Sequence, residues 1–205
     1  MFDKASVFSI SIDLVILGLL YLCMRPVLVK QESLSARRLR FSIFLIVLFS
    51  VMATWSGDWY NYQEIFNDIR SNPSWTSHME GIYDFLIRYI CPYYLMFRLM
   101  VWGTALGLFG ITIKRLGMNV QNIWCILGLG FLPFFAYARV SIVPAMLIAG
   151  ATFCMIPFYR RKALSISLGL LLLGLSLFFH KTAFFGLLVM LFCFIVPQTT
   201  KNSWF

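Results

Sequence analysis

Five ionisable side chains lie between long apolar segments, where they could hold a charged substrate or move a proton. A histidine or a carboxylate can accept the proton of an attacking hydroxyl group. An arginine stays charged and donates two parallel hydrogen bonds to a phosphate. These residue types predict a site that holds an anion while a hydroxyl group is activated, formed by Asp58, Glu80, Arg139, His180 and Lys181.

Two further charges, Asp13 and Arg98, lie inside apolar segments, in the outer third of each. A charge within a membrane span costs about 2.5–3.5 kcal/mol on insertion scales, and by default it marks a functional site. The ionisable residues outside the basic loops thus converge on one face, and none marks a path through the bilayer centre. This pattern favours a site on the outer face over a transport channel.

Most of these residues also have a structural interpretation, and the sequence leaves both interpretations open. Asp58 could cap the helix that follows it. Asp13 and Arg98 could form an ion pair between two spans. Lys181 could extend into the lipid headgroups, and His180 could simply end a helix.

Arg139 is the residue that structure alone explains least well. It divides two apolar segments, 121–138 and 141–159, and no acid lies near it in the sequence. A phosphate group is therefore its most natural counter-charge. The two segments could be two spans or one re-entrant hairpin.

The composition predicts that a membrane surrounds the elements that position these residues. Apolar residues make up 60% of the chain and charged residues 12%, whereas a soluble domain carries about 25% charged residues. The net charge of +9 resides in short basic runs between apolar stretches. It does not form a basic stripe with interleaved aromatic residues, which argues against a nucleic-acid partner.

The apolar segments predict an all-α fold, a polytopic transmembrane bundle that forms one domain over residues 1–205. A span needs about 20 apolar residues to cross the hydrocarbon layer. About seven segments approach this length, namely 6–24, 41–56, 93–113, 121–138, 141–159, 163–179 and 183–197.

Lysines and arginines predict the orientation, because they concentrate in cytoplasmic loops. Of the 17 in the chain, eleven fall on one side, which places the amino terminus outside. The first segment is expected to be an anchor rather than a cleaved signal peptide, because its basic cluster follows the apolar run. The eleven are Arg25, Lys30, Arg37, Arg38, Arg40, Lys114, Arg115, Arg160, Arg161, Lys162 and Lys201.

The polar loop 57–92 is predicted to lie outside and to contain two interfacial helices. Aromatic and aliphatic residues recur in it at helical spacing, and a Ser-Asn-Pro-Ser turn at 71–74 separates the two patterns. Cys91 lies in this loop, whereas Cys23 is predicted inside. The five cysteines are odd in number and lack metal-ligand spacing, so neither a disulfide framework nor a metal or other cofactor is expected.

At these residues the sequence resembles the EpsG/Wzy-type bacterial polysaccharide polymerases, over residues 50–190. Four short motifs carry the resemblance, and each contains one of the ionisable residues above. They are Gly-Asp-Trp-Tyr-Asn-Tyr at 57–62, Glu-Gly-Ile-Tyr-Asp-Phe-Leu at 80–86, Arg-Val-Ser-Ile-Val-Pro-Ala at 139–145, and Phe-His-Lys-Thr-Ala at 179–183.

The resemblance implies a multi-pass enzyme of the bacterial inner membrane with a GT-C-like fold. Such an enzyme links undecaprenyl-diphosphate-bound oligosaccharides into O-antigen, capsule or exopolysaccharide on the outer side. The lipid-linked oligosaccharide is its substrate, and a flippase and a chain-length regulator are candidate partners. Members usually continue through several further spans after the histidine, so the resemblance implies a truncated member.

In this interpretation His180, Asp58 or Glu80 is the catalytic base, and Arg139, with Arg98 or Lys181, holds the diphosphate. The aromatic residues of the loop, Tyr62 and Tyr83 among them, would face the sugar rings. Two alternatives remain, a transporter or flippase that binds its substrate with the same charges, and a non-catalytic scaffold of a glycan assembly complex.

Overall fold

Every secondary-structure element in the described part of the computed structural model is helical, which confirms the predicted all-α class for these residues. The structure describes residues 4–30, 33–52, 57–72, 74, 81–119, 121, 138–156, 158 and 160–195. The elements in chain order are α1 (Lys4–Lys30), α2 (Ala36–Met52), α3 (Gly57–Ser71), α4 (Gly81–Phe85), the π-helical turn η1 (Leu86–Ile90), α5 (Tyr94–Arg115), α7 (Ala138–Met155), α8 (Lys162–Phe179) and α9 (Ala183–Ile195).

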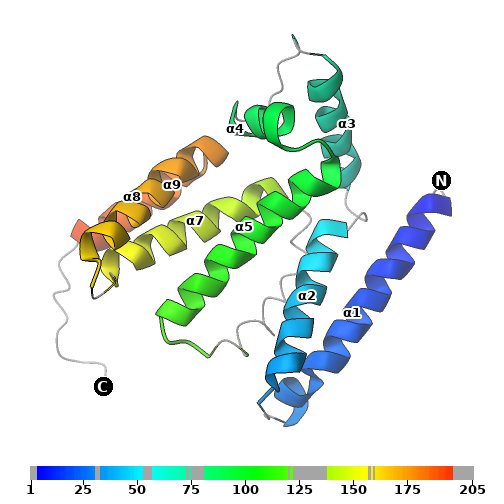
Figure 1. Ribbon diagram of the computed structural model, residues 1–205, viewed down its shortest axis with the longest axis horizontal. Helices are drawn as coiled ribbons and strands as arrows, with labels where there is room; N and C mark the ends of the chain where they lie inside the picture. The colour runs from blue at the N-terminus through cyan, green and yellow to red at the C-terminus, as the bar shows by residue number, and fades with distance from the viewer. Residues whose placement is uncertain are drawn as a thin grey trace.

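The long helices lie side by side, and each packs on the next (Figure 1). Helix α1 packs on α2, α2 on α5, α5 on α7, and α7 on both α8 and α9. Helices α3 and α4 lie across one end of this row, which we call the loop end. At the opposite end, the basic end, α2 begins and α5 finishes, and the side chains of Arg37, Arg38, Arg40 and Lys114 are exposed.

Three described helices are long and apolar enough to cross a membrane. They are the Ser11–Val29 part of α1, α5 and α8, and they coincide with the predicted spans 6–24, 93–113 and 163–179. Many large apolar side chains on them face outward, including Leu14, Leu170 and Leu171. An apolar surface of this extent indicates contact with lipid, so the chain is a membrane protein.

The remaining predicted spans are matched only in part. Helices α2 and α9 have 17 and 13 residues, at and below the lower limit for a span. Helix α7 contributes a shorter apolar stretch, Ile142–Met155. The predicted span 121–138 lies almost entirely outside the described residues, so seven spans stays a prediction.

Two glycines set the register between α7 and α8. A Cβ atom on Gly150 would lie 2.9 Å from the carbonyl oxygen of Gly169, and one on Gly169 would lie 2.7 Å from that of Gly150. The helix backbones therefore approach as closely as glycine allows, which is how small residues join helices in membranes. In the same register, the Ser165 hydroxyl donates a hydrogen bond of 2.9 Å to the Phe153 carbonyl.

The described parts of the loop 57–92 are largely helical, as predicted, and these helices pack onto the bundle. The buried face of α3 includes Phe66 and Ile69, which are 4% and 1% exposed. Arg70, in the last turn of α3, donates hydrogen bonds to the carbonyls of Ile87 and Arg88 in η1. This arginine satisfies the free carbonyls at the end of a helix and ties η1 to α3.

Cys91 is buried, so its labelling by a thiol reagent cannot show the orientation of the chain in the membrane. Cys91 is fully buried, and its Sγ lies 3.9 Å from Sδ of Met100. Burial raises the pKa of the Cys91 thiol, and the thiolate is the reactive form. Cys91 should therefore react slowly near neutral pH on whichever side of the membrane it lies.

Cysteines at exposed positions of the two ends should report the orientation instead. Tyr93 at the loop end is 73% exposed and Met118 at the basic end is 49% exposed. On intact spheroplasts, we expect an impermeant maleimide to label Tyr93→Cys and to spare Met118→Cys until the membrane is permeabilised. The reverse labelling pattern would rule out a site on the outer face.

Candidate functional site

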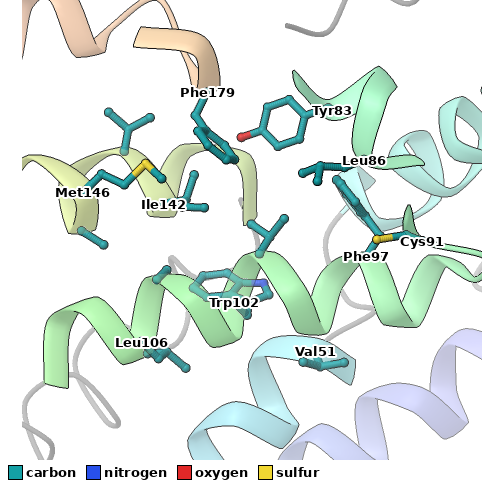
Figure 2. Packing of buried hydrophobic residues seen from close by; sticks show 14 of the residues in the cluster. Val51, Tyr83, Leu86, Cys91, Phe97, Trp102, Leu106, Ile142, Met146 and Phe179 are labelled. Atoms are coloured by element: carbon teal, nitrogen blue, oxygen red, sulfur yellow. The ribbon is translucent and has the colours of Figure 1, made fainter. Parts of the chain in front are cut away.

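An aromatic cluster at the loop end joins four helices. The ring of Tyr83 in α4 packs edge-on against Phe179 of α8, with centroids 5.6 Å apart, and against Phe97 of α5 at 5.9 Å. Phe66 of α3 packs on Tyr94 and Phe97. Figure 2 shows Tyr83 between Phe97 and the end of α8. Such pairs contribute about 0.5–1.5 kcal/mol each beyond the area that they bury, so the cluster holds the end of α8 against α4.

His180 follows Phe179 directly, so the aromatic cluster also positions this candidate catalytic residue. Helix α8 ends because the backbone of His180 is extended, with φ −165° and ψ 139°. The His180 ring is half-buried, and its Nδ1 accepts a hydrogen bond of 3.1 Å from the backbone N–H of Thr182. The Thr182 hydroxyl oxygen lies 2.9 Å from the same nitrogen.

These contacts define what the ring of His180 can do. A backbone N–H can only donate, so Nδ1 must carry the lone pair, and the proton of the neutral ring is on Nε2. In this tautomer Nε2–H donates a hydrogen bond and cannot accept a proton. The ring of His180 can therefore offer a hydrogen-bond donor at Nε2.

The register of α7 and α8 brings Arg139 to the level of His180. The two helices are antiparallel (Figure 1), and Gly150 faces Gly169. Arg139 lies as many residues from Gly150 as His180 lies from Gly169, in both cases toward the loop end. The backbone of Arg139, in the first turn of α7, is thus at the height of the α8–α9 turn. Its side chain is outside the described part.

The structure describes the other three candidate residues, Asp58, Glu80 and Lys181, to different extents. Lys181 lies in the turn after His180 with its side chain exposed. Asp58 lies in the first turn of α3, which begins at Gly57 rather than after Asp58. The side chain of Asp58, like the whole of Glu80, falls outside the described residues.

Arg98 occupies a structural position instead of a binding position. It is 1% exposed, and its guanidinium donates hydrogen bonds of 2.6 and 3.0 Å to the carbonyls of Ser50 and Val51 at the end of α2. It also shares a hydrogen bond with Tyr94 and interacts electrostatically with Asp13 of α1. Arg98 thereby joins α1, α2 and α5, which favours the structural interpretation over contact with a diphosphate.

The two tyrosines expected to face sugar rings are packed into the protein. Tyr83 is fully buried, so its ring supports the end of α8 and presents no face to a ligand. Tyr62 is half-buried against the core and retains some exposed surface. The prediction that loop aromatics bind sugar therefore does not hold for Tyr83 in this conformation.

Sequence reasoning missed the contacts of Thr182 and Arg70. The hydrogen bond from the backbone N–H of Thr182 to the ring of His180 had no signal in the sequence, because every residue except proline has such an N–H group. The bonds from Arg70 to η1 had none either, since they join residues 17 and 18 positions apart. Within the described ranges no three His, Cys, Asp or Glu side chains gather as metal ligands would.

No family model, curated protein or solved structure matches this chain.

Proposed function

We propose that this chain is a membrane glycan polymerase that joins undecaprenyl-diphosphate-linked oligosaccharide repeats into O-antigen, capsule or exopolysaccharide. The reaction would take place on the outer side of a bacterial inner membrane, in a GT-C-like bundle. One observation supports this proposal most directly, namely that the α7–α8 register brings Arg139 and His180 to one level at the loop end. This placement fits a site for a diphosphate at headgroup depth.

The proposed reaction divides the chemistry among these residues. A hydroxyl of the acceptor sugar attacks the anomeric carbon of the donor, and the bond from that carbon to the diphosphate oxygen breaks. A carboxylate, Asp58 or Glu80, takes the hydroxyl proton. Arg139 binds the departing lipid diphosphate, with Lys181 as a second cation, and Nε2–H of His180 donates a hydrogen bond to an oxygen of the same leaving group.

The two alternative functions, a transporter or flippase and a scaffold, differ in where they require ionisable residues. A transporter or flippase needs ionisable groups near the bilayer centre and broken helices. In the described spans, the buried charges are Asp13, in the amino-terminal half of α1, and Arg98, in the second turn of α5. A scaffold of a glycan assembly complex needs no chemistry at all, and it predicts that substitution of the site residues leaves the polymer unchanged.

Arg139 provides the test of the proposed function. We expect deletion of the gene in its host to remove long glycan chains, and the wild-type gene to restore them. Arg139→Ala should lower the rate of polymerisation roughly 10- to 150-fold, because one charge-assisted contact is worth about 1.5–3 kcal/mol. Arg139→Lys should recover only part of the lost polymerisation rate, because lysine lacks the planar guanidinium group that binds a phosphate through two hydrogen bonds.

Chain length is read on a gel, and protein level in the membrane by blot. A scaffold is indicated if Arg139→Ala, present at the wild-type level, supports chains of normal length. Accumulation of untransported repeat units on the inner side, measured after deletion, would indicate a flippase.

A further inference from the structure

An apolar groove runs between α2 and α5 from mid-helix to the basic end. Its volume is about 420 Å³, within the range of ligand pockets. Ile43 and Val47 of α2 form one wall, and Leu106 and Ile111 of α5 contribute to the other. Three glycines of α5 line it as well, Gly103, Gly107 and Gly110, and Lys114 closes its end.

Two of the three glycines of this groove are not covered by the described part of the protein. A Cβ atom on Gly103 or Gly107 would have nothing within 4 Å. By contrast, Gly150 and Gly169 are covered, because α7 and α8 meet there in backbone contact. The groove is therefore open along Gly103 and Gly107 in the described part of the protein.

Lys114 provides the charge that identifies the occupant. Its side chain is exposed at the point where the groove reaches the basic end. The next residue, Arg115, is engaged elsewhere, since it donates a hydrogen bond to the Ile156 carbonyl and lies over the rings of Phe153 and Phe158. Lys114 is thus the cation that borders the groove.

The surroundings of Lys114 are strongly basic. Three exposed arginines in the first turns of α2 lie at the same end, Arg37, Arg38 and Arg40. The acids with described side chains lie on other elements, namely Glu64 and Asp68 on α3, Asp84 on α4 and Asp13 in the amino-terminal half of α1. A basic site between membrane helices at the headgroup level attracts anionic lipid headgroups.

We propose that this groove binds one anionic phospholipid, with an acyl chain along Gly103, Gly107 and Gly110 and the headgroup phosphate on Lys114. The volume of the groove suits a single hydrocarbon chain, and Lys114 at its end suits the phosphate of a headgroup. This lipid site is at the end of the bundle opposite His180 and does not depend on the proposed function.

The experiment uses the full chain in detergent and native mass spectrometry. The probes are palmitoyl-oleoyl phosphatidylglycerol and phosphatidylcholine with the same acyl chains. The wild type should retain one phosphatidylglycerol in preference to phosphatidylcholine. Gly107→Leu should lower the apparent affinity for both lipids at least about 10-fold, because the new side chain fills the groove.

Lys114→Gln should abolish the preference for the anionic lipid and leave phosphatidylcholine binding unchanged. Gly174→Leu, at another uncovered helix glycine, and Lys162→Gln, at an exposed lysine that begins α8, are the matched controls and should behave as wild type. Lys114 is on the surface, so its variant is informative even if Gly107→Leu fails to fold.

Two results would overturn the proposal. One is undiminished phosphatidylglycerol preference in Lys114→Gln. The other is a Gly107→Leu protein that binds lipid normally but has lost a dimer that the wild type forms, which would assign the glycines to contact with a second copy of the chain.

Discussion

Arg98→Met is expected to destabilise the protein by about 3–5 kcal/mol, the usual result of removing one partner from a buried charged network. The Arg98 side chain is 1% exposed and donates to the last carbonyls of α2. Methionine fills a similar volume but leaves those carbonyls and the buried carboxylate of Asp13 without the guanidinium. The measurement is the free energy of unfolding in mixed detergent micelles, together with the protein level in the membrane.

Arg70→Met is the matched control for this prediction. Arg70 also donates to two carbonyls at the end of a helical element, but its side chain is exposed, and water replaces those bonds when they are lost. The loss of stability should therefore be much smaller. Adding Asp13→Asn to Arg98→Met should recover part of the stability, since it removes the uncompensated charge. Equal losses for Arg98→Met and Arg70→Met would show that burial does not determine the role of Arg98.

The sequence predicted best the elements with the strongest local signal. The spans at 93–113 and 163–179 coincide with α5 and α8 to within two residues, because long apolar runs flanked by charges leave few alternatives. The first span was predicted to end at residue 24, but α1 continues through Pro26 to Lys30. A proline removes one hydrogen bond from a helix and need not end it when the surrounding structure supports the helix.

The positions of the site residues could be predicted only where topology alone determines them. Arg139 and His180 were expected at one face because each follows or precedes a span, and the α7–α8 register agrees with this. The roles of Arg98 and Tyr83 depend on contacts between distant residues. The partners of Arg98 are 47 and 48 positions away, and an aromatic residue in a polar loop can equally be a ligand platform or part of the core.

The tautomer of His180 is a further property that no sequence pattern could supply. A histidine after an apolar helix is compatible with a base, a donor or a helix end. Only the 3.1 Å hydrogen bond from Thr182 N–H to Nδ1 separates these roles. Within the proposed reaction, this bond favours a carboxylate as the proton acceptor and the imidazole as a hydrogen-bond donor.

His180→Ala is expected to abolish long glycan chains, whereas His180→Gln is expected to retain measurable polymerisation. The glutamine amide can donate a hydrogen bond from near the position of Nε2–H, but it cannot accept a proton at neutral pH. If His180 donates, alanine should cost roughly 10- to 150-fold more in rate than glutamine. If it is the base, both variants should lose about 10²–10⁴-fold. Lys162→Gln, at the opposite end of α8, is the control, and chain length on a gel is the measurement.

The tautomer itself can be measured without any activity, which separates it from the proposed function. The chain has two histidines, His78 and His180, so ¹⁵N-histidine labelling of His78→Gln protein leaves one imidazole to observe. Nδ1 should show the chemical shift of an unprotonated nitrogen and Nε2 that of a protonated one. A proton on Nδ1 would contradict the donor role. If Nε2 carries the proton but the protein makes no polymer, the assigned tautomer of His180 stands and only the proposed polymerase function is refuted.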